Sequence, residues 1–547
     1  MVDVLTTSQR SYNMSRIRSK GTNPEKYLEK LLRASKVSGF KKHPKGVVGK
    51  PDIYFPQEKV AVFVDGCFWH GCKECFQMPK THRKFWREKI KSNIHRDRTV
   101  NTQLRSQDIK VIRIWDHELK KSPDEAIQRI MSELNNASSP KVLDLFAGAG
   151  GLSEGFIKAG CEMIGHVELD KDACDTLITR MVYHALSRMG KIEEYKNYIL
   201  GNIDRDELIK KYELQKEKDS VICAKIEKKN YKEIIEQIKK RLAGEHLDII
   251  VGGPPCQAYS NIGRARDKNG MRRDKRNFLY KYYVEFLKAL RPKIFVFENV
   301  QGLESAGKGK YLADMRRLMT QAGYQTDYKV INAVNFGVPQ NRKRIILVGW
   351  SKDSRLERYP DFPVCERSYI VENFLNDLPR IRAGEGQVVR EDFLSCSSLL
   401  KDIGIVNPEL HVLMSHISRP HTEQDLEIYR LAILAKKENK NLKYNLLPQR
   451  LKTHKNEKGF LDRFKVVDSK SKGSHTVVAH IARDGHYYIH PDLRQNRSLS
   501  VREAARLQTF PDDYKFEGSR TAQYRQIGNA VPPMLSWIIA KEIIKHL

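Results

Sequence analysis

The residue best placed to act as a nucleophile is Cys256. It ends the run Gly-Gly-Pro-Pro-Cys over residues 252–256, directly after an apolar segment, residues 247–251, that we predict to be a buried strand. The glycines allow a sharp turn, and the prolines stiffen the loop that presents the cysteine. A thiol on a polar loop can ionise and attack, whereas a buried thiol is inert. By itself, Pro-Pro-Cys is more often a structural turn, so the assignment depends on the rest of the chain.

Two acidic residues and a glycine turn supply further chemistry. Glu298 ends the apolar strand predicted over residues 293–300, at the place where open α/β sheets carry ligand-binding groups. Residues 141–151 indicate a strand, a glycine turn and a helix start, and Glu168 follows at the spacing of an acid that binds ribose hydroxyls. The pattern predicts an adenosine-containing cofactor and leaves open whether it is a dinucleotide.

A second group of reactive residues lies near the N-terminus. Cys67, Cys72 and Cys75 are crowded, and His117 is the best candidate for the fourth ligand of a tetrahedral zinc ion. A zinc site closed by four protein ligands is structural. The alternative is three unrelated buried cysteines.

Three further residues of the same region form a weaker pattern. Glu25 and Asp52 offer oxygen ligands suited to magnesium, and His70 could activate water or protonate a leaving group. Spacing alone does not separate these roles from those of surface residues.

The elements that must position these residues follow from periodicity. We predict a helix around residues 24–32 and strands at 51–55 and 60–64, then a polar linker at 135–140. Repeated alternation of strands and helices from residue 141 to residue 350 favours a mostly parallel sheet, with residues 210–241 as a solvated helical insertion. The alternation fails over residues 351–496, whose basic clusters at 450–455 and 470–472 suit phosphate contact or a solvated surface equally well.

Composition points to a polyanionic partner. The chain has 547 residues, a formal net charge of +31 and a pI near 9.6, which favours nucleic acid. That length fits about three to four domain-sized units. No apolar run approaches the ~20 residues of a membrane span, and the N-terminus lacks the apolar core of a signal peptide. Nine unevenly spread cysteines suggest reduced thiols, so we expect a cytoplasmic bacterial protein without a membrane partner.

The N-terminal motifs resemble the very short patch repair endonucleases, which nick DNA beside the thymine of a T:G mismatch. The resemblance rests on residues 49–53, 63–72 and 85–90, covers about residues 9–134, and implies a restriction-endonuclease-like fold. It implies that Asp52 is the main magnesium ligand, that Glu25 belongs to the same acidic site, and that His70 is catalytic. The other residues that it implies are the zinc ligands Cys67, Cys72, Cys75 and His117 and the base-stack wedge Phe68, Trp69 and Trp86.

Two features of this region qualify the resemblance. Ordinary core packing is the alternative interpretation of the three aromatic residues, and it is the one that the sequence alone favours. Some family members have Thr-His where this chain has Val64-Asp65. A threonine that serves through its backbone carbonyl can be replaced by valine, but the loss of a second histidine affects proton transfer.

From about residue 141 to residue 547 the chain resembles the cytosine carbon-5 DNA methyltransferases. The motifs, in family order, are those at residues 144–151, 252–257, 298–300, 340–344 and 526–532. The resemblance implies a class I, Rossmann-like catalytic domain with a smaller target-recognition domain, and S-adenosylmethionine as methyl donor. It places Phe146, Gly148, Glu168, Asn202, Leu279 and Asn529 at cofactor positions, with Asn202 where the family usually has aspartate.

The family chemistry explains the remaining residues. Cys256 attacks carbon 6 of cytosine, Glu298 binds ring nitrogen 3 and the exocyclic amine, and Arg342 and Arg344 anchor the base and its backbone. Because none of these groups can reach a base inside a duplex, the target must be flipped out.

The two halves form one hypothesis about organisation and function. We expect an endonuclease-like domain (1–134), a linker (135–140), a catalytic domain (141–350, rejoined by 497–547) and a target-recognition domain (351–496). The expected protein is a monomer that acts on double-stranded DNA and consists of a cytosine methylase fused to a T:G nickase. We expect it to bind zinc and magnesium, and to work beside a restriction endonuclease that recognises the same DNA sequence. The alternatives are an inactive zinc-stabilised DNA-binding module at the N-terminus, or methylation of tRNA.

Overall fold

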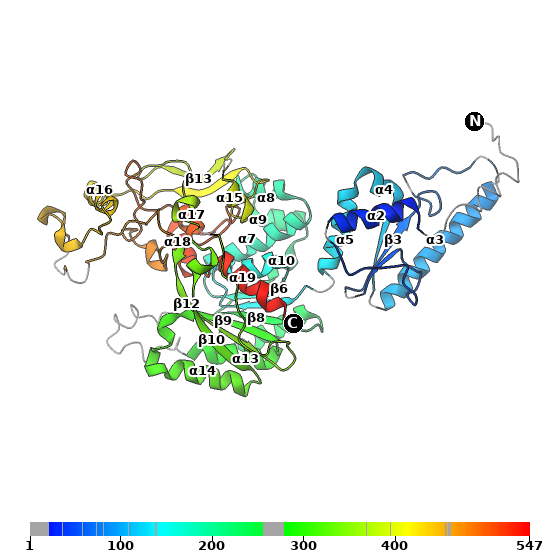
Figure 1. Cartoon of the computed structure of the whole chain (residues 1–547), viewed down its shortest axis with the longest axis horizontal. Helices are drawn as coiled ribbons and strands as arrows, with labels where there is room; N and C mark the ends of the chain where they lie inside the picture. Colours follow the sequence, from blue (N-terminus) through cyan, green and yellow to red (C-terminus); the bar gives the residue numbers. More distant parts are fainter. Residues whose placement is uncertain are drawn as a thin grey trace. The chain divides into compact units, whose positions relative to one another are not determined.

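The computed structural model describes residues 21–547 except 36, 57, 73, 80, 82, 108, 137–138, 255–277, 368, 394, 396, 454–456 and 458–460. The chain divides into two compact units, Met1–Ser139 and Pro140–Leu547, drawn in Figure 1 with the first unit in blue to cyan. Among the described residues, no helix combines the length and the apolar character needed to cross a bilayer.

The first unit is built on a four-stranded sheet in the order β1-β2-β3-β4. Its strands are β1 (Lys41–Lys42), β2 (Ile53–Phe55), β3 (Val60–Asp65) and β4 (Lys110–Trp115). Its helices are α2 (Asn23–Ala34), α3 (Arg83–Ser106), α4 (Asp116–Lys121) and α5 (Pro123–Asn136). β3 and β4 are parallel and the other pairs are antiparallel.

Side chains that alternate along the strands of this sheet pack into two hydrophobic cores, one on each face. Val60 and Val62 pack with Leu28 of α2 and Ile127 of α5 on one face. On the other face, Phe63 and its neighbours pack against α3. The result is a mixed α/β layer structure, in which the ends of β2 and β3 carry the polar residues singled out above.

The second unit contains a seven-stranded sheet in the order β10-β12-β9-β8-β5-β6-β7. Its strands are β5 (Lys141–Leu145), β6 (Glu162–Glu168), β7 (Val221–Cys223), β8 (Ile249–Gly252), β9 (Ile294–Val300), β10 (Gln325–Asn332) and β12 (Lys343–Trp350). β12 runs antiparallel to the other six strands, which are parallel to one another. The strand order reverses at β5 and β8, and open sheets bind ligands at the carboxyl ends of strands at such a point.

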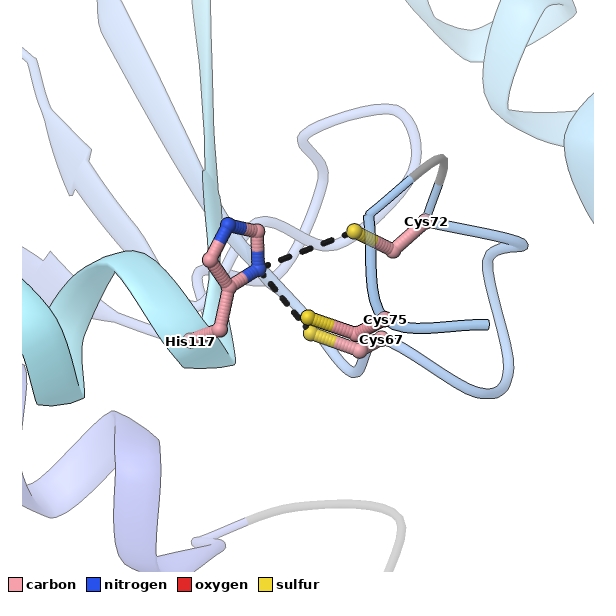
Figure 2. Close-up of side chains that lie close together, drawn as sticks. All are labelled: Cys67, Cys72, Cys75 and His117. Atoms are coloured by element: carbon pink, nitrogen blue, oxygen red, sulfur yellow. Dashed lines mark hydrogen bonds between the residues drawn. The ribbon is translucent and has the colours of Figure 1, made fainter. Parts of the chain in front are cut away.

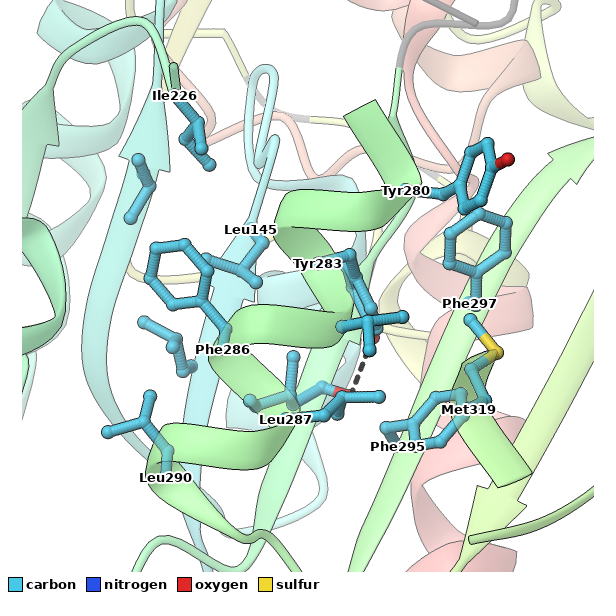
Figure 3. Packing of buried hydrophobic residues seen from close by; sticks show 14 of the residues in the cluster. Leu145, Ile226, Tyr280, Tyr283, Phe286, Leu287, Leu290, Phe295, Phe297 and Met319 are labelled. Carbon is cyan, nitrogen blue, oxygen red and sulfur yellow. Dashed lines mark hydrogen bonds between the residues drawn. The ribbon is translucent and has the colours of Figure 1, made fainter. Parts of the chain in front are cut away.

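Helices cover both faces of this sheet. They are α6 (Gly151–Lys158), α7 (Lys171–Arg188), α11 (Tyr231–Leu242), α13 (Leu279–Leu290), α14 (Lys310–Gln321) and α19 (Pro533–Ile544). Three further helices, α8 (Ile192–Ile199), α9 (Arg205–Lys211) and α10 (Gln215–Asp219), lie between α7 and β7 in the chain, and α8 and α9 pack against α7. Ile250 and Phe295 face the core under α11, α13 and α14, whereas Val251 and Val296 face α6 and α19. Figure 3 shows the first core, in which Tyr283 of α13 packs against Phe295 and Phe297. The expected α/β class is confirmed, with a mostly parallel, Rossmann-like sheet in the second unit.

One prediction for this sheet is wrong in part. Residues 210–241 are not a solvated helical insertion throughout, because β7 lies within them and pairs with β6 as the edge strand of the main sheet. A strand of only three residues in a Lys/Glu-rich neighbourhood is too short for periodicity to identify.

Apart from β12 and α19, residues 340–547 combine irregular chain with short elements. These are β11 (Gln340–Asn341) paired with β15 (Ser474–His475), β13 (Gly386–Glu391) paired with β14 (Val412–Ile417), and the helices α15 (Ser398–Asp402), α16 (Glu423–Lys437), α17 (Val501–Leu507) and α18 (Arg520–Asn529). α17 begins with a capping box between Ser500 and Glu503 and is entirely buried. Within it, Arg502 donates to the carbonyls of Met414 and Tyr514, which joins the irregular region to the C-terminal segment.

Candidate functional site

A large cleft opens at the carboxyl ends of β5, β6, β8 and β9, at the point where the strand order reverses. Its volume is about 2460 Å³, several times the roughly 300–1,000 Å³ that one small ligand needs. The cleft can therefore hold a cofactor together with part of a second, larger substrate.

The turn between β5 and α6 forms one end of this cleft. Phe146 and Gly148 both have left-handed backbone, with φ of 60° and 56°. The Gly148 N–H donates to Glu168 Oε2 over 2.7 Å, and Oε1 of the same carboxylate accepts from the N–H groups of Leu169 and Asp170. These bonds fix the Glu168 carboxylate at the cleft wall, where its remaining lone pairs can accept hydrogen bonds from the hydroxyl groups of a ligand.

Two of the glycines after this turn are required by close packing. A Cβ on Gly151 would lie 2.1 Å from the Val531 carbonyl oxygen, and one on Gly155 would lie 2.3 Å from the Trp537 nitrogen. Helix α6 therefore rests directly on the start of α19, and Ser536 Oγ donates to the Leu152 carbonyl over 2.6 Å. This contact fixes the position of α6, whose N-terminal turn lines the cleft.

Most of the residues predicted to bind the cofactor line this cleft together, but Asn202 does not. The residues that line it are Phe146, Gly148, Glu168, Leu279 and Asn529. Asn202 is exposed in the turn between α8 and α9. Helices α8 to α10 lie between α7 and β7 in the chain, and Asn202 belongs to this connection. The cleft lies at the carboxyl ends of the strands, so it is the segment directly after β7, residues 224–228, that lines it. Sequence reasoning missed that segment, since β7 was not recognised.

The two described residues that follow β8 line the same cleft. Cys256 lies outside the described residues, but Gly253 and Pro254 line the cleft. A Cβ on Gly252 would lie 1.9 Å from the Leu145 carbonyl oxygen, and one on Gly253 would lie 1.9 Å from that of Glu298. Only glycine fits between these two carbonyls, which explains the Gly-Gly pair better than the turn alone.

Glu298 and Arg344 face each other at this end of the cleft. Arg344 Nε lies 2.9 Å from Glu298 Oε1, and both side chains are mostly buried. They are neighbours because β9 and β12 pair in antiparallel register, with Arg344 opposite Val300. The pair presents a carboxylate and a guanidinium in a region of reduced water access, where hydrogen bonds to a bound polar ring are strong.

Arg342 differs from the prediction that it anchors the base. Its guanidinium is buried, and it donates to the carbonyls of Val477 over 2.8 Å and Ala530 over 2.8 Å. It does not line the cleft. Two residues apart on one extended strand, Arg342 and Arg344 would point to the same side. Arg342 lies between β11 and β12 and not within a strand, so their side chains point to different places.

The opposite wall of the cleft comes from residues 465–488. Lys465, His480, Arg483 and Tyr487 line it. The Arg342 bond to the Val477 carbonyl holds the backbone just before His480. The basic clusters at 450–455 and 470–472, which suit phosphate contact or a solvated surface equally well, have acidic partners: Arg450 pairs with Glu427 and Lys470 with Glu372 on the surface. Lys455 lies outside the described residues.

In the first unit, the three cysteines and His117 come together as shown in Figure 2. The Cys67 and Cys72 sulfurs lie 3.2 and 3.6 Å from His117 Nδ1, and all four ligand atoms, including that of Cys75, lie within 4.8 Å of one another. Ligands around a tetrahedral zinc ion with bonds of about 2.0–2.3 Å have comparable spacing. Glu74 Oε2 lies 3.2 Å from His117 Nε2, an arrangement that leaves Nδ1 toward the sulfurs.

The acidic residues of the first unit also converge, with one addition. Glu25, Asp52 and His43 place one potential ligand atom each within 4.8 Å of one another. The Val64 N–H donates to Asp52 Oδ2 over 2.7 Å. Burial and the nearby Glu25 carboxylate raise the pKa of Asp52 to about 6. His43 was not identified from the sequence, because a lone histidine beside lysines carries no motif.

His70 has a partner that the sequence did not reveal. Its Nδ1 lies 2.6 Å from Asp97 Oδ2 on α3, and 3.7 Å from Asp65 Oδ1 at the end of β3. Arg113 lies 2.8 Å from Asp65 Oδ1 and 3.2 Å from Asp97 Oδ1, so it holds both carboxylates beside the imidazole. A carboxylate on Nδ1 orients the ring and leaves Nε2 available for proton transfer.

The aromatic residues of the first unit form one half-buried cluster. The Phe68 ring packs edge-on against Trp69 and Trp86, with centroids 5.3 and 5.2 Å apart. Phe85, 59% exposed, extends the cluster to the surface. These rings are not part of the buried core, so they are accessible to a partner.

Comparison with known proteins gives a match for each unit. The family described as C-5 cytosine-specific DNA methylase matches residues 140–209 and 182–545, and the family described as DNA mismatch endonuclease Vsr matches residues 2–77. The fusion inferred from the motifs is thereby confirmed. The match in the first unit ends before Trp86, Asp97 and His117.

Similar proteins include two bacterial methyltransferases. The type II methyltransferase M.Bpa9945I of Bacillus paralicheniformis is 42% identical over 445 residues, which cover 74% of this chain and 98% of the relative. The type II methyltransferase M1.HphI of Haemophilus parahaemolyticus is 29% identical and covers 74% of this chain and 86% of the relative. A solved structure, a candidate DNA modification methyltransferase encoded in an E. coli prophage, has the same fold at 22% identity, with a TM-score of 0.50, covering 74% of this chain and 99% of that one.

Proposed function

We infer that this chain, which belongs to the C-5 cytosine-specific DNA methylase family, methylates carbon 5 of cytosine within a specific sequence of double-stranded DNA. The observation that carries the inference is a single cleft that joins the Glu168 turn to the Glu298–Arg344 pair. The basic wall with Arg483 on its other side suits a phosphate backbone.

S-Adenosylmethionine, the cofactor that the family implies, supplies an electrophilic methyl group. The residues present fit it: the glycine turn admits a ligand to the backbone, and the Glu168 carboxylate, held by three N–H groups, accepts ribose hydroxyls. Phe146, Leu279 and residues 224–228 offer apolar surface and backbone groups for an aromatic base. Asn529 borders the same space.

Cytosine carbon 5 is a weak nucleophile, and the proposed residues overcome this by covalent catalysis. The Cys256 thiolate adds to carbon 6, which places electron density on carbon 5 and nitrogen 3. Glu298, hydrogen-bonded through a proton to nitrogen 3, stabilises that charge, and Arg344 orients Glu298 and the base. Once carbon 5 carries the methyl group, its proton passes to solvent water, and the electrons of that C–H bond re-form the double bond between carbons 5 and 6 as the bond from carbon 6 to the Cys256 sulfur breaks, which releases the thiolate. The cytosine must be flipped out of the duplex to enter the cleft.

A duplex that carries 5-fluorocytosine at the target site tests this mechanism. Fluorine cannot leave as the proton does, so the wild-type protein should remain covalently attached to the DNA, and Cys256→Ser should not. A wild-type protein that methylates ordinary duplex but forms no adduct would show that the covalent route is wrong.

For the first unit we propose magnesium-dependent nicking of DNA at T:G mismatches, in which zinc bound by the three cysteines and His117 stabilises the fold. The convergence of Glu25 and Asp52 supports a divalent cation site, and the His70–Asp97 pair supports a proton-transfer group. Phe68, Trp69 and Trp86 offer half-buried rings for insertion beside the mismatch.

The two activities are chemically related. Deamination of 5-methylcytosine leaves thymine opposite guanine, which is the lesion that a mismatch endonuclease nicks. We therefore propose that the chain repairs damage that its own methylation makes possible, beside a restriction endonuclease that acts on the same sequence.

The alternative is a methylase with an inactive zinc module that only binds DNA. A T:G duplex incubated with the protein and magnesium separates the two: the proposal predicts a nick beside the thymine that Asp52→Asn abolishes. Absence of nicking over a broad range of conditions, with the T:G duplex still bound, would support the inactive module.

A further inference from the structure

The imidazole of His43 lies between the two carboxylates of the acidic site in the first unit. Its Nε2 is 3.3 Å from Glu25 Oε2, and its Nδ1 is 3.8 Å from Asp52 Oδ1. The three side chains come from three places in the chain: α2, the end of β1 and the start of β2. All three are only partly exposed.

The backbone directs His43 into this site. Its φ is +44°, in the left-handed region that side chains other than asparagine, aspartate and histidine seldom adopt. Its N–H donates to the Asp52 carbonyl over 3.2 Å, so the turn that ends β1 is fixed to β2. The imidazole and the Asp52 carboxylate therefore project from two hydrogen-bonded neighbours.

The two carboxylates are themselves held in place. Glu25 Oε1 accepts from Thr22 Oγ1 over 2.8 Å, and Oε2 accepts from the Gly21 N–H over 2.8 Å. Asp52 Oδ2 accepts from the Val64 N–H, which leaves Oδ1 toward His43. Separations of 3.3 and 3.8 Å are close to those between neighbouring ligands of a cation bound at about 2.0–2.2 Å.

We propose that His43 is a third protein ligand of the divalent cation in this site, and that its imidazole makes the site prefer Mn²⁺ to Mg²⁺. The proposal rests on the proposed nuclease function of the acidic site. Carboxylates alone suit Mg²⁺, Ca²⁺ and Mn²⁺ alike, whereas an imidazole nitrogen favours transition metals. A donor set of one nitrogen and two carboxylates should therefore separate Mn²⁺ from Mg²⁺.

A competing role for His43 gives the opposite result. A protonated imidazole could act as the counter-ion of Glu25 and Asp52 and occupy the space of the metal. Removal of that positive charge would strengthen the binding of cations. Removal of a ligand would weaken it, and would weaken Mn²⁺ binding more than Mg²⁺ binding.

The experiment uses the full chain, with zinc loaded at the cysteine cluster, titrated with Mn²⁺ and followed by electron paramagnetic resonance. In the wild-type protein, pulsed measurements should detect one histidine nitrogen coupled to bound Mn²⁺. In His43→Ala we expect that coupling to disappear, Mn²⁺ affinity to fall about tenfold, equivalent to about 1.4 kcal/mol, and Mg²⁺ affinity from competition to change by less than about threefold. His95→Ala, at an exposed histidine of α3, is the matched control and should resemble wild type.

Several outcomes would overturn the proposal: no nitrogen coupling in the wild-type protein, or Mn²⁺ affinity that is unchanged or raised in His43→Ala. The wild-type coupling requires no variant, and His43→Gln provides a polar substitute if the alanine variant does not fold. T:G nicking, measured in parallel, separates this proposal from the proposed function. Nitrogen-coupled Mn²⁺ without nicking would contradict only the nickase, and nicking unaffected by His43→Ala at limiting Mn²⁺ would contradict only the ligand role.

Discussion

At the scale of single residues, the account depends on the carboxylate of Glu298. Glu298→Gln keeps the size of the side chain but removes its charge and its ability to hold a proton at cytosine nitrogen 3. We expect the rate of methyl transfer to fall by about 10²–10³-fold, the range for loss of one group that stabilises developing charge. Single-turnover transfer of labelled methyl measures this rate.

Binding measurements give the control for that prediction. Glu298 does not belong to the turn that holds Glu168, so S-adenosylmethionine affinity, measured by calorimetry, should be unchanged in Glu298→Gln. If both affinity and rate fall together, Glu298 contributes to the structure of the cleft and its chemical role is not supported.

Several residues of the site were predictable because their motifs encode a local geometry. The Gly-Gly pair before Cys256 fits between two carbonyl oxygens, and the spacing from the glycine turn to Glu168 reflects one strand-helix-strand unit. Residues chosen by long-range packing were not predictable. Asp97 and His43 reach their sites only through the tertiary arrangement of α3 and of the turn after β1.

At the level of helices and strands, the contact between α6 and α19 should determine the position of the turn between β5 and α6. In Gly155→Ala the new Cβ would lie 2.3 Å from the Trp537 nitrogen, a backbone atom that cannot move alone. We expect the free energy of unfolding to fall by about 1–3 kcal/mol, as in other overpacked cores, and cofactor binding to weaken because α6 shifts. Urea unfolding and calorimetry measure the two effects.

A matched glycine provides the control for this prediction. In Gly165→Ala, on β6, the nearest atoms would lie at 3.5 and 3.6 Å, which is ordinary van der Waals contact. That variant should keep its stability within about 1 kcal/mol. Equal effects at both positions would show that the contact with α19 is not the cause.

The centre of β6 makes stability depend on pH. His166 is fully buried, and its two ring nitrogens have no hydrogen-bond partner within the described part of the chain. Burial lowers the pKa of His166 from 6.5 to about 4. The unfolded chain therefore binds a proton that the folded chain rejects. The stability contribution is complete above about pH 6.5 and decreases as the pH falls toward 4, by up to about 3 kcal/mol.

His166→Leu, which cannot titrate, tests this effect. Between pH 7 and pH 4.5 its melting temperature should fall less steeply than that of the wild-type protein in differential scanning calorimetry. Other buried histidines, such as His490, also have a lowered pKa and keep part of the slope in both proteins. Identical slopes would refute the role of His166.

Long, periodic elements were predicted well, and short or inserted ones were not. The apolar runs of β8 and β9 and the amphipathic α13 follow directly from spacing. β7 has only three residues, and the helices α8 to α10 separate it from α7, so Asn202 was assigned to the cofactor and residues 224–228 were not. The alternation of hydrophobic residues cannot show which of two segments reaches a cleft.

At the scale of the whole molecule, the two proposed activities belong to two compact units of the chain. The net charge of +31 suits a chain whose units both act on DNA. The proposed catalytic residues of each activity belong to one unit, so Asp52→Asn should leave methylation unchanged, and Cys256→Ser should leave T:G nicking unchanged. Radiolabel transfer and strand cleavage on the same preparations measure both. Loss of both activities in either variant would contradict independent sites.

The most direct test joins the two activities on one DNA sequence. Bisulfite sequencing of DNA methylated by the purified protein identifies the target cytosine, and a duplex is then made with thymine opposite guanine at that position. The account predicts that the wild-type protein with a divalent cation nicks this duplex beside the thymine, and nicks a T:G pair in an unrelated sequence much more slowly. A protein that methylates the site fully but leaves the T:G duplex intact would contradict the claim that one chain both makes and repairs this mark.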